Sequence, residues 1–291
     1  MKWFYECFGI SKQAFYKRQN SYKESQNQDQ KLIEMVNQER KRVNSKTGGI
    51  KLYSALKPAM NELGIKKGRD KFYDFLRANK LLVPRTKNFH ITTDSNHRYH
   101  KYPNLVQNMV PTRPEQLFVS DITYIKTQNG HNYLALVTDA YSKQIMGYKL
   151  ANHMKASLCT EALDMAIKNR LYPNKPLIHH SDRGFQYCST EYVKFATDNK
   201  IKMSMTEQYD PYENAIAERI NRTLKYEFGL REVIKNTSLA KKMVKHSVEV
   251  YNERRLHLSL NMLTPASVHK NPTIEYKSYK KNKSSIKKML T

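Results

Sequence analysis

Three carboxylates stand where their surroundings suit metal chemistry: Asp121, Asp182 and Glu218, with 35 residues between the last two. Asp121 interrupts the apolar run 117–125, and Asp182 ends a short apolar stretch, 177–182. A buried carboxylate is costly unless it is paired, hydrogen-bonded or bound to metal. Three close carboxylates repel one another, and their pKa values rise unless a cation is present. Since Mg²⁺ prefers hard oxygen ligands, the three acids predict a divalent-metal site.

Each acid also has a plainer interpretation. Asp121 could serve a structural hydrogen bond, and Asp182 could be a turn residue where a strand gives way to a loop. Glu218 could belong to an ordinary amphipathic helix. If the acids do converge, two metal ions about 4 Å apart would activate a water or a 3′-hydroxyl and stabilise the leaving oxygen. No protein nucleophile would then be required.

The segment around Glu218 has helical periodicity, with an apolar stripe and a polar line on opposite sides. The apolar stripe comprises Ile216, Ile220 and Leu224. The polar line comprises Asn214, Glu218, Asn221 and Lys225, which fall within about 60° of one another on a helical wheel. Such a line would let Glu218 reach toward a sheet edge, with Lys225 two turns further on, suited to a phosphate.

Charge and composition point to a nucleic-acid partner. Lys and Arg outnumber Asp and Glu by 51 to 26, which gives a net charge of +25. This excess predicts attraction to phosphate backbones, although a structural nucleic-acid binder would look the same on charge alone. The three cysteines are far apart and lack zinc-site spacing, which indicates free thiols. Neither a signal peptide nor a membrane span is indicated, so we expect a cytoplasmic, nucleoid-associated bacterial protein without a membrane partner.

The basic N-terminal part, 1–83, is mostly helical in pattern. A turn and a short helix are expected at 9–18, with Ser11 as N-cap. Lys12, Lys17 and Arg18 could face DNA, as in the second helix of a helix-turn-helix; a solvated basic helix is the alternative. Further helices are expected at 28–43, 50–61 and 70–79, with a basic turn between the last two. Prolines punctuate a linker at 84–114, and 271–291 is a basic tail that would order on a partner.

From residue 115 to 270 the pattern is that of an α/β domain. Strands are expected at 117–125, 133–138, 145–150, 177–180 and 201–205. Asn129 and Gly130 give a strong hairpin signal between the first two. Helices are expected at 156–169, 190–199, from about 212, and at 238–251. Antiparallel strands followed by alternating helices and strands predict a mixed five-stranded sheet with flanking helices.

The chain resembles DDE transposases of bacterial insertion sequences, in the group related to retroviral integrases. The resemblance rests on the segments 121–125, 180–187, 204–206, 213–221, 251–260 and 263–265. It implies a ribonuclease-H-like core, preceded here by a small helical DNA-binding region. It assigns Asp121, Asp182 and Glu218 as the catalytic and metal-binding triad, with two Mg²⁺ or Mn²⁺ ions. It also implies that Lys225 contacts the end of the element, and Asn221, one turn earlier on the same polar line, is expected to bind DNA as well.

The resemblance implies hydrolytic nicking at the element's end, then attack of the freed 3′-hydroxyl on another DNA phosphate. Its partners would be terminal inverted repeats and target DNA, bound by a homo-oligomer. Members are often the downstream product of two reading frames, so an upstream product or frameshift fusion is a further expected partner. A non-catalytic regulator derived from a transposase is the alternative function, and a plain nuclease of the same fold is a third.

Several residues depart from the family pattern or compete with the triad. Glu213 and Leu256 replace residues usual at their positions, and the Gly48–Gly49 pair replaces an aromatic-glycine pattern. Asp139, which the family motif does not include, is interpreted as a turn or strand-end residue. The adjacent histidines at 179–180 precede the second Asp; packing or hydrogen bonding is favoured for them over metal ligation.

Overall fold

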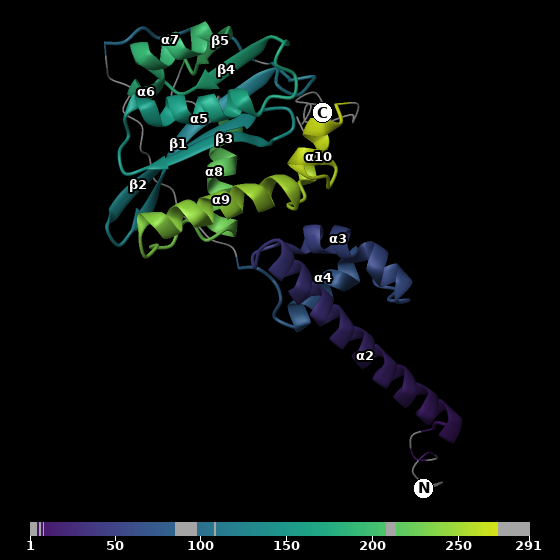
Figure 1. Cartoon of the computed structure of the whole chain (residues 1–291). Coiled ribbons are helices and arrows are strands. Elements are labelled where there is room, and N and C mark those ends of the chain that lie inside the picture. Colours follow the sequence, from purple (N-terminus) through teal and green to yellow (C-terminus); the bar gives the residue numbers. More distant parts are fainter. Residues whose placement is uncertain are drawn as a thin grey trace, which may run out of the picture. The chain divides into compact units, whose positions relative to one another are not determined.

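The computed structural model describes residues 5, 7, 9–84, 98–107, 109–207 and 214–272 (Figure 1). The chain divides into two units, Met1–Thr86 and Lys87–Thr291. The predicted tail lies almost wholly outside the described residues, as does much of the predicted linker. Of the described helices, none is long and apolar enough to span a membrane.

The first unit is built from α2 (Lys12–Arg42), α3 (Gly49–Glu62) and α4 (Arg69–Ala78). Its core comprises Leu32, Val36, Leu52, Leu56, Met60, Ile65, Phe72, Phe75 and Leu76. Ser11 caps α2 as predicted, because its hydroxyl accepts from the Ala14 backbone N–H at 3.1 Å. The basic turn expected between α3 and α4 is also present.

Helix α2 corrects the prediction of a short helix at 9–18 separate from one at 28–43. It is one helix of 31 residues. The polar composition of 19–27 suggests a break, yet this stretch contains neither Gly nor Pro and so nothing that interrupts a helix. Only Leu32 and Val36 of this helix are buried, so its first half does not belong to the core.

The second unit contains a five-stranded mixed sheet, as predicted. Its strands are β1 (Leu117–Thr127), β2 (Gly130–Asp139), β3 (Ile145–Ala151), β4 (Leu177–Ser181) and β5 (Ile201–Met205). The strand order is β3-β2-β1-β4-β5. Strands β1 to β3 pair antiparallel, whereas β4 pairs parallel with both β1 and β5. The predicted hairpin is confirmed, with Gly130 at φ +110°.

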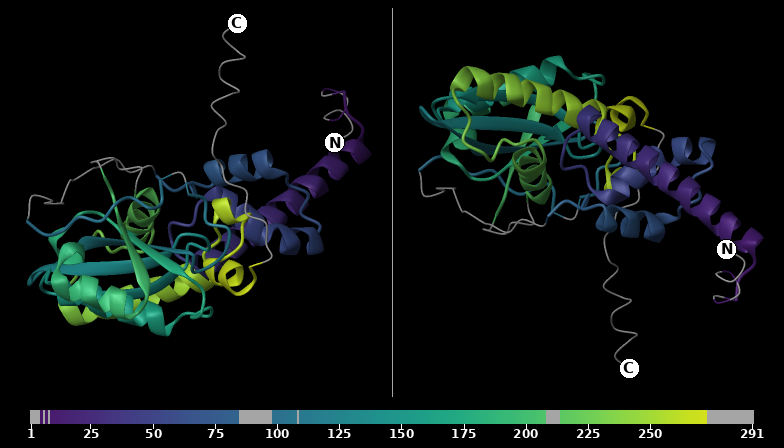
Figure 2. Two further views of the ribbon diagram at one scale, coloured as in Figure 1. Left: turned by 90° about the horizontal axis from the view of Figure 1, so that it is seen from above. Right: turned by 90° about the horizontal axis from the view of Figure 1, so that it is seen from below.

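Helices cover both faces of this sheet (Figure 1). On one face lie α5 (Ala156–Lys168), α6 (Phe185–Cys188) and α7 (Thr190–Asp198). On the other lie α8 (Ala215–Glu227) and α9 (Thr237–Glu253), and the view from below has α9 running along the sheet (Figure 2). Side chains on opposite faces of β1 pack into the two layers. Phe118 packs under α5, and Ile125 packs against α8 and α9.

The C-terminal helix α10 (Pro265–Lys270), which follows a short 3₁₀ turn (Leu258–Leu260), was not predicted. Its buried His269 lies between two carboxylates: Nε2 is 3.2 Å from Glu115 and Nδ1 is 3.4 Å from Asp139. Asp139 ends β2 and also accepts from the Ser142 backbone N–H at 2.8 Å. This confirms its interpretation as a strand-end residue and shows how α10 is attached to the core.

Part of the predicted linker packs on the rest of the second unit. The Leu105 backbone N–H donates to the Ser204 hydroxyl at 2.9 Å, and the Met205 N–H donates to the Pro103 carbonyl at 3.4 Å. Tyr102 packs on the core cluster beneath α5 and α7. Residues 102–105 are therefore attached to the core beside β5.

Candidate active site

Strand pairing brings the first two acids side by side. In the parallel pair of β1 with β4, Phe118 lies opposite His179 and Val119 opposite His180. Asp121 and Asp182 each lie two residues after that last pair. Because the two strands are parallel, both residues are displaced to the same side of the pair. Neighbouring strands are about 4.8 Å apart, which places the two carboxylates close together.

Asp121 is held by two N–H donors. The Asn221 side-chain amide donates to Oδ2 at 2.8 Å, and the Ile122 backbone N–H donates to Oδ1 at 2.8 Å. Burial, together with repulsion from Asp182 and Glu218, raises the pKa of Asp121 to about 7. The two hydrogen bonds favour the carboxylate and offset part of this rise. Three acids from three distant segments therefore act on one another.

Asp182 lies in a tight turn immediately after β4. Its Oδ1 accepts from the Gly184 backbone N–H at 3.0 Å. A Cβ on Gly184 would lie 3.0 Å from that same oxygen, which is tighter than ordinary van der Waals contact, so a larger residue here would require the carboxylate to shift by a few tenths of an ångström. The turn thus fixes the direction in which this carboxylate points.

The polar line of α8 lies against β1. Asn214 at the start of the helix donates to the Ser120 carbonyl at 2.9 Å, and Asn221 reaches Asp121. Both asparagines are buried, and each has a side-chain oxygen without a partner among the described residues. One turn on, the Lys225 ammonium is 4.0 Å from the centre of the Tyr124 ring. The sequence predicted the line, but it could not say that these amides would fasten the helix to the strand of the first acid.

Glu218 projects from this line between the two asparagines and is exposed. Partial burial and repulsion from Asp182 raise its pKa. Within the described ranges, no group of three or more His, Cys, Asp or Glu side chains is close enough to hold a metal ion. The structure therefore brings the predicted triad into electrostatic contact but not to ligand distance.

The two histidines before Asp182 are buried and hydrogen-bonded. His179 Nε2 is 2.7 Å from the Ser120 hydroxyl and 2.9 Å from the Tyr192 hydroxyl. His180 Nδ1 is 2.9 Å from the Ser204 hydroxyl. Burial and the neighbouring His180 lower the pKa of His179 to about 3, which keeps it neutral. These contacts confirm the packing and hydrogen-bonding interpretation.

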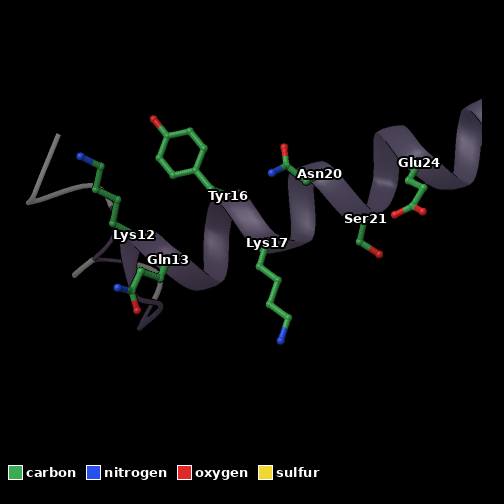
Figure 3. Close-up of a pocket in the computed structure, with 7 residues that line it drawn as sticks. All are labelled: Lys12, Gln13, Tyr16, Lys17, Asn20, Ser21 and Glu24. Atoms are coloured by element: carbon green, nitrogen blue, oxygen red, sulfur yellow. The ribbon is translucent and has the colours of Figure 1, made fainter.

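Lys12, Lys17 and Arg18 are exposed on the first half of α2, in the other unit. A surface depression there is lined by Lys12, Gln13, Tyr16, Lys17, Asn20, Ser21 and Glu24 (Figure 3). The structure does not bring these residues together with the three acids within one unit.

Arg255 has a structural role that sequence reasoning missed. In the sequence, Arg255 is part only of the segment 251–260 that resembles the family, yet its guanidinium makes two hydrogen bonds of 2.7 Å to Glu227 at the end of α8. Its Nη1 is also 2.9 Å from His257 Nε2. This largely buried pair ties the helix that carries Glu218 to the segment after α9. The only available signal was the matching family motif, which does not identify a partner.

The chain is similar to known proteins over most of its length. Residues 111–211 and 199–265 match two families that are each described as an integrase core domain. Among solved structures, the magnesium complex of the HTLV-2 integrase catalytic core domain has 18% identity and a TM-score of 0.43. That alignment covers 54% of this chain and 97% of the viral domain.

An insertion element IS600 protein of 31 kDa from Shigella sonnei is 32% identical over 90% of this chain and 96% of its own length. The IS629 transposase of the same organism is 32% identical over 56% of this chain and 55% of its own length. The putative IS150 transposase of Escherichia coli is 32% identical and is covered over 58% of its length. The chain thus spans about half the length of these two named transposases. This chain belongs to the family of bacterial insertion-sequence transposases with an integrase-type core.

Proposed function

We propose that this protein cuts DNA at the ends of an insertion sequence and transfers the freed 3′-hydroxyl to another DNA phosphate. Asp121, Asp182 and Glu218 are its proposed catalytic and metal-binding residues. The observation that carries this assignment is the raised pKa of Asp121, whose causes include repulsion from both other acids. A group of acids that repel one another is stabilised by a cation.

The donor set fits Mg²⁺ or Mn²⁺, because all three candidate ligands are hard carboxylate oxygens. Two bound metal ions would activate a water or a 3′-hydroxyl and would stabilise the negative charge on the leaving oxygen. The exposed side chain of Glu218 would complete the site by rotating toward the two aspartates. Asn221 and Gly184 would hold Asp121 and Asp182 in place during that rotation.

The proposed reaction has two steps at one site. In the first, water attacks a phosphorus at the element's end, the bond to the 3′ oxygen breaks, and that oxygen leaves as a hydroxyl. In the second, this hydroxyl attacks another DNA phosphorus and displaces a second 3′ oxygen. Both steps build negative charge on the phosphate, which the Lys225 ammonium beside Tyr124 would offset.

DNA binding is proposed for both units. Lys225 would contact the element's end near the acids, while Lys12, Lys17 and Arg18 on α2 would contact the terminal repeats. Asn221 is buried and hydrogen-bonded to Asp121, so it would act on the DNA end through that carboxylate. In this proposal, residues 1–83 form the DNA-binding region, 84–114 the linker, 115–270 the catalytic core and 271–291 a basic tail. Joining two ends calls for a homo-oligomer on DNA, with an upstream reading-frame product or fusion as an added partner.

The test is a cleavage and joining assay on labelled DNA that carries the element's own ends, with and without Mg²⁺. Asp182→Asn is compared with Asp198→Asn, which removes the charge of an exposed aspartate at the end of α7. We expect nicked and joined products with wild type and Asp198→Asn and none with Asp182→Asn. Binding without metal-dependent cleavage in wild type would instead favour a regulator.

A further inference from the structure

The first half of α2 is exposed on every side. Residues 16–27 are all exposed, and the helix buries only Leu32 and Val36, further along. This exposed stretch makes more than three helical turns, so it has no side that packs against the core of its own unit. The helix nevertheless begins at a defined cap, Ser11. It therefore projects from the unit with its surface available to a partner.

The side chains of the segment 12–27 are those that meet DNA. Its charged residues are four cations and one anion: Lys12, Lys17, Arg18, Lys23 and Glu24. Its amides are Gln13, Gln19, Asn20, Gln26 and Asn27. Cations bind phosphates, and Asn or Gln can hydrogen-bond both the N6 and the N7 of adenine in the major groove. The composition therefore combines backbone binding with base reading.

A second copy of α2 is a poorer partner for this segment. Helices pair through apolar side chains that recur about every 3.5 residues. In this segment the last apolar residue is Tyr22, and no other follows until Leu32. That gap of nearly three turns lacks the seam that a helical dimer needs.

One face of the segment has the arrangement that fits a major groove. Gln13 and Asn20, which line the depression in Figure 3, are seven residues apart in the helix. They therefore lie within about 20° of one another and about 10 Å apart along the axis, the length of about three base-pair steps. At about 100° per residue, Lys12 and Lys23 project to one side of this line and Lys17 to the other. A helix about 10–12 Å across fits a groove about 12 Å wide, with phosphates on both sides.

Glu24 indicates that this face is turned toward bases. It lines the same depression, one turn beyond Asn20. A carboxylate is repelled by phosphates but accepts a hydrogen bond from the amino group of cytosine. Its position suits the base edges at the floor of a groove and not the backbone.

We propose that residues 12–27 of α2 lie in the major groove of a terminal repeat, where Gln13 and Asn20 each read an adenine. Each amide donates to adenine N7 and accepts from the N6 amino group, and the flanking lysines bind phosphates. The inference rests on the proposed function, and it adds the groove and the base that the first unit recognises.

The test measures binding of the full chain, without metal, to the terminal repeat and to a shuffled duplex of the same composition. Each amide–adenine contact contributes about five- to 150-fold in affinity. We expect Gln13→Ala and Asn20→Ala each to weaken binding to the repeat by a factor in that range and to leave binding to the shuffled duplex unchanged. Lys17→Gln should weaken both equally. Gln128→Ala, which removes an exposed amide in the turn between β1 and β2, is the control and should change neither.

A repeat with 7-deazaadenine in place of adenine tests the groove itself, because it lacks the N7 acceptor and is unchanged in the minor groove. Wild type should bind this repeat more weakly than the normal one. The double variant Gln13→Ala, Asn20→Ala should bind the two repeats equally. Equal binding of the two repeats by wild type would overturn the inference, as would undiminished discrimination by the double variant.

Cleavage of the same repeat with Mg²⁺ separates this inference from the proposed function. Wild-type cleavage, with Gln13→Ala and Asn20→Ala still binding the repeat as tightly as wild type, would overturn the groove contact and leave the function standing. Weakened binding confined to the repeat in these variants, with no metal-dependent cleavage by wild type, would support the contact and reject the function. Equal weakening on both duplexes would assign the amides to the backbone and overturn base reading.

Discussion

Replacing Asp121 by Asn should stabilise the metal-free protein, and more so at high pH. The pKa of this carboxyl is raised from 3.8 to about 7 in the folded protein. The folded state then binds more protons than the unfolded state between those values, so stability falls as pH rises through the interval. One pKa unit corresponds to about 1.4 kcal/mol, so the full effect above pH 7 is about 4 kcal/mol.

At about pH 5 Asp121 is largely protonated in the folded protein, and only about 1.6 kcal/mol of this effect has developed. The Asn side chain of the Asp121→Asn variant has only one acceptor oxygen, so the hydrogen bond from the Ile122 backbone N–H is lost. This loss costs about 1 kcal/mol at either pH. That cost cancels when the two conditions are compared. The gain from Asp121→Asn should therefore be about 2 to 3 kcal/mol larger at about pH 8 than at about pH 5.

Urea unfolding in EDTA at both pH values measures this difference. Asp198→Asn serves as the control for loss of an exposed carboxylate and should change stability equally at the two pH values. An equal effect of Asp121→Asn at both would refute the reasoning that burial and the neighbouring acids repel this charge. Addition of Mg²⁺ should shrink the advantage of the variant, because the cation relieves the repulsion in wild type.

Three further predictions concern His269, Arg255 and Lys225. Burial alone would lower the pKa of His269, but its two carboxylate partners raise it to about 9. The protonated imidazolium therefore stabilises the fold fully below about pH 6.5, and this stabilisation is lost as pH rises through about 9. His269→Gln should therefore destabilise the protein more near pH 7 than near pH 10 in urea unfolding. Arg255→Ala leaves the partly buried Glu227 without its bidentate partner and should lower the free energy of unfolding by about 2 to 3 kcal/mol in the same assay. Arg255→Lys should restore little of this loss, because an ammonium cannot make the bidentate contact. Lys225→Gln should weaken binding to all DNA sequences alike and reduce the salt dependence of log K by about one, as measured by fluorescence anisotropy across a salt series.

The sheet was predictable because its strands are marked by strong local signals. Alternating and continuous apolar runs, the Asn129–Gly130 turn and the helical wheel around Glu218 all correspond to elements of the structure. The error in α2 arose because polar composition suggested a break where no helix-breaking residue exists. Helices α6 and α10 have four and six residues, too short for periodicity to reveal them.

The supports of the site could not be predicted, because they depend on contacts between distant segments. Asn221 was identified as a polar residue on the face of Glu218, but its hydrogen bond to Asp121 spans 100 positions. The pairing of Arg255 with Glu227 likewise follows from packing, not from local pattern.

The most direct test of the central claim, that the three acids form one metal centre, is Mn²⁺ binding followed by electron paramagnetic resonance in the presence of a DNA end. We expect wild type and Asp198→Asn to bind Mn²⁺ with equal affinity, and Asp121→Asn, Asp182→Asn and Glu218→Gln each to bind it much more weakly. Unchanged Mn²⁺ affinity in Glu218→Gln would contradict the account, because the helix α8 carboxylate would then not belong to the centre.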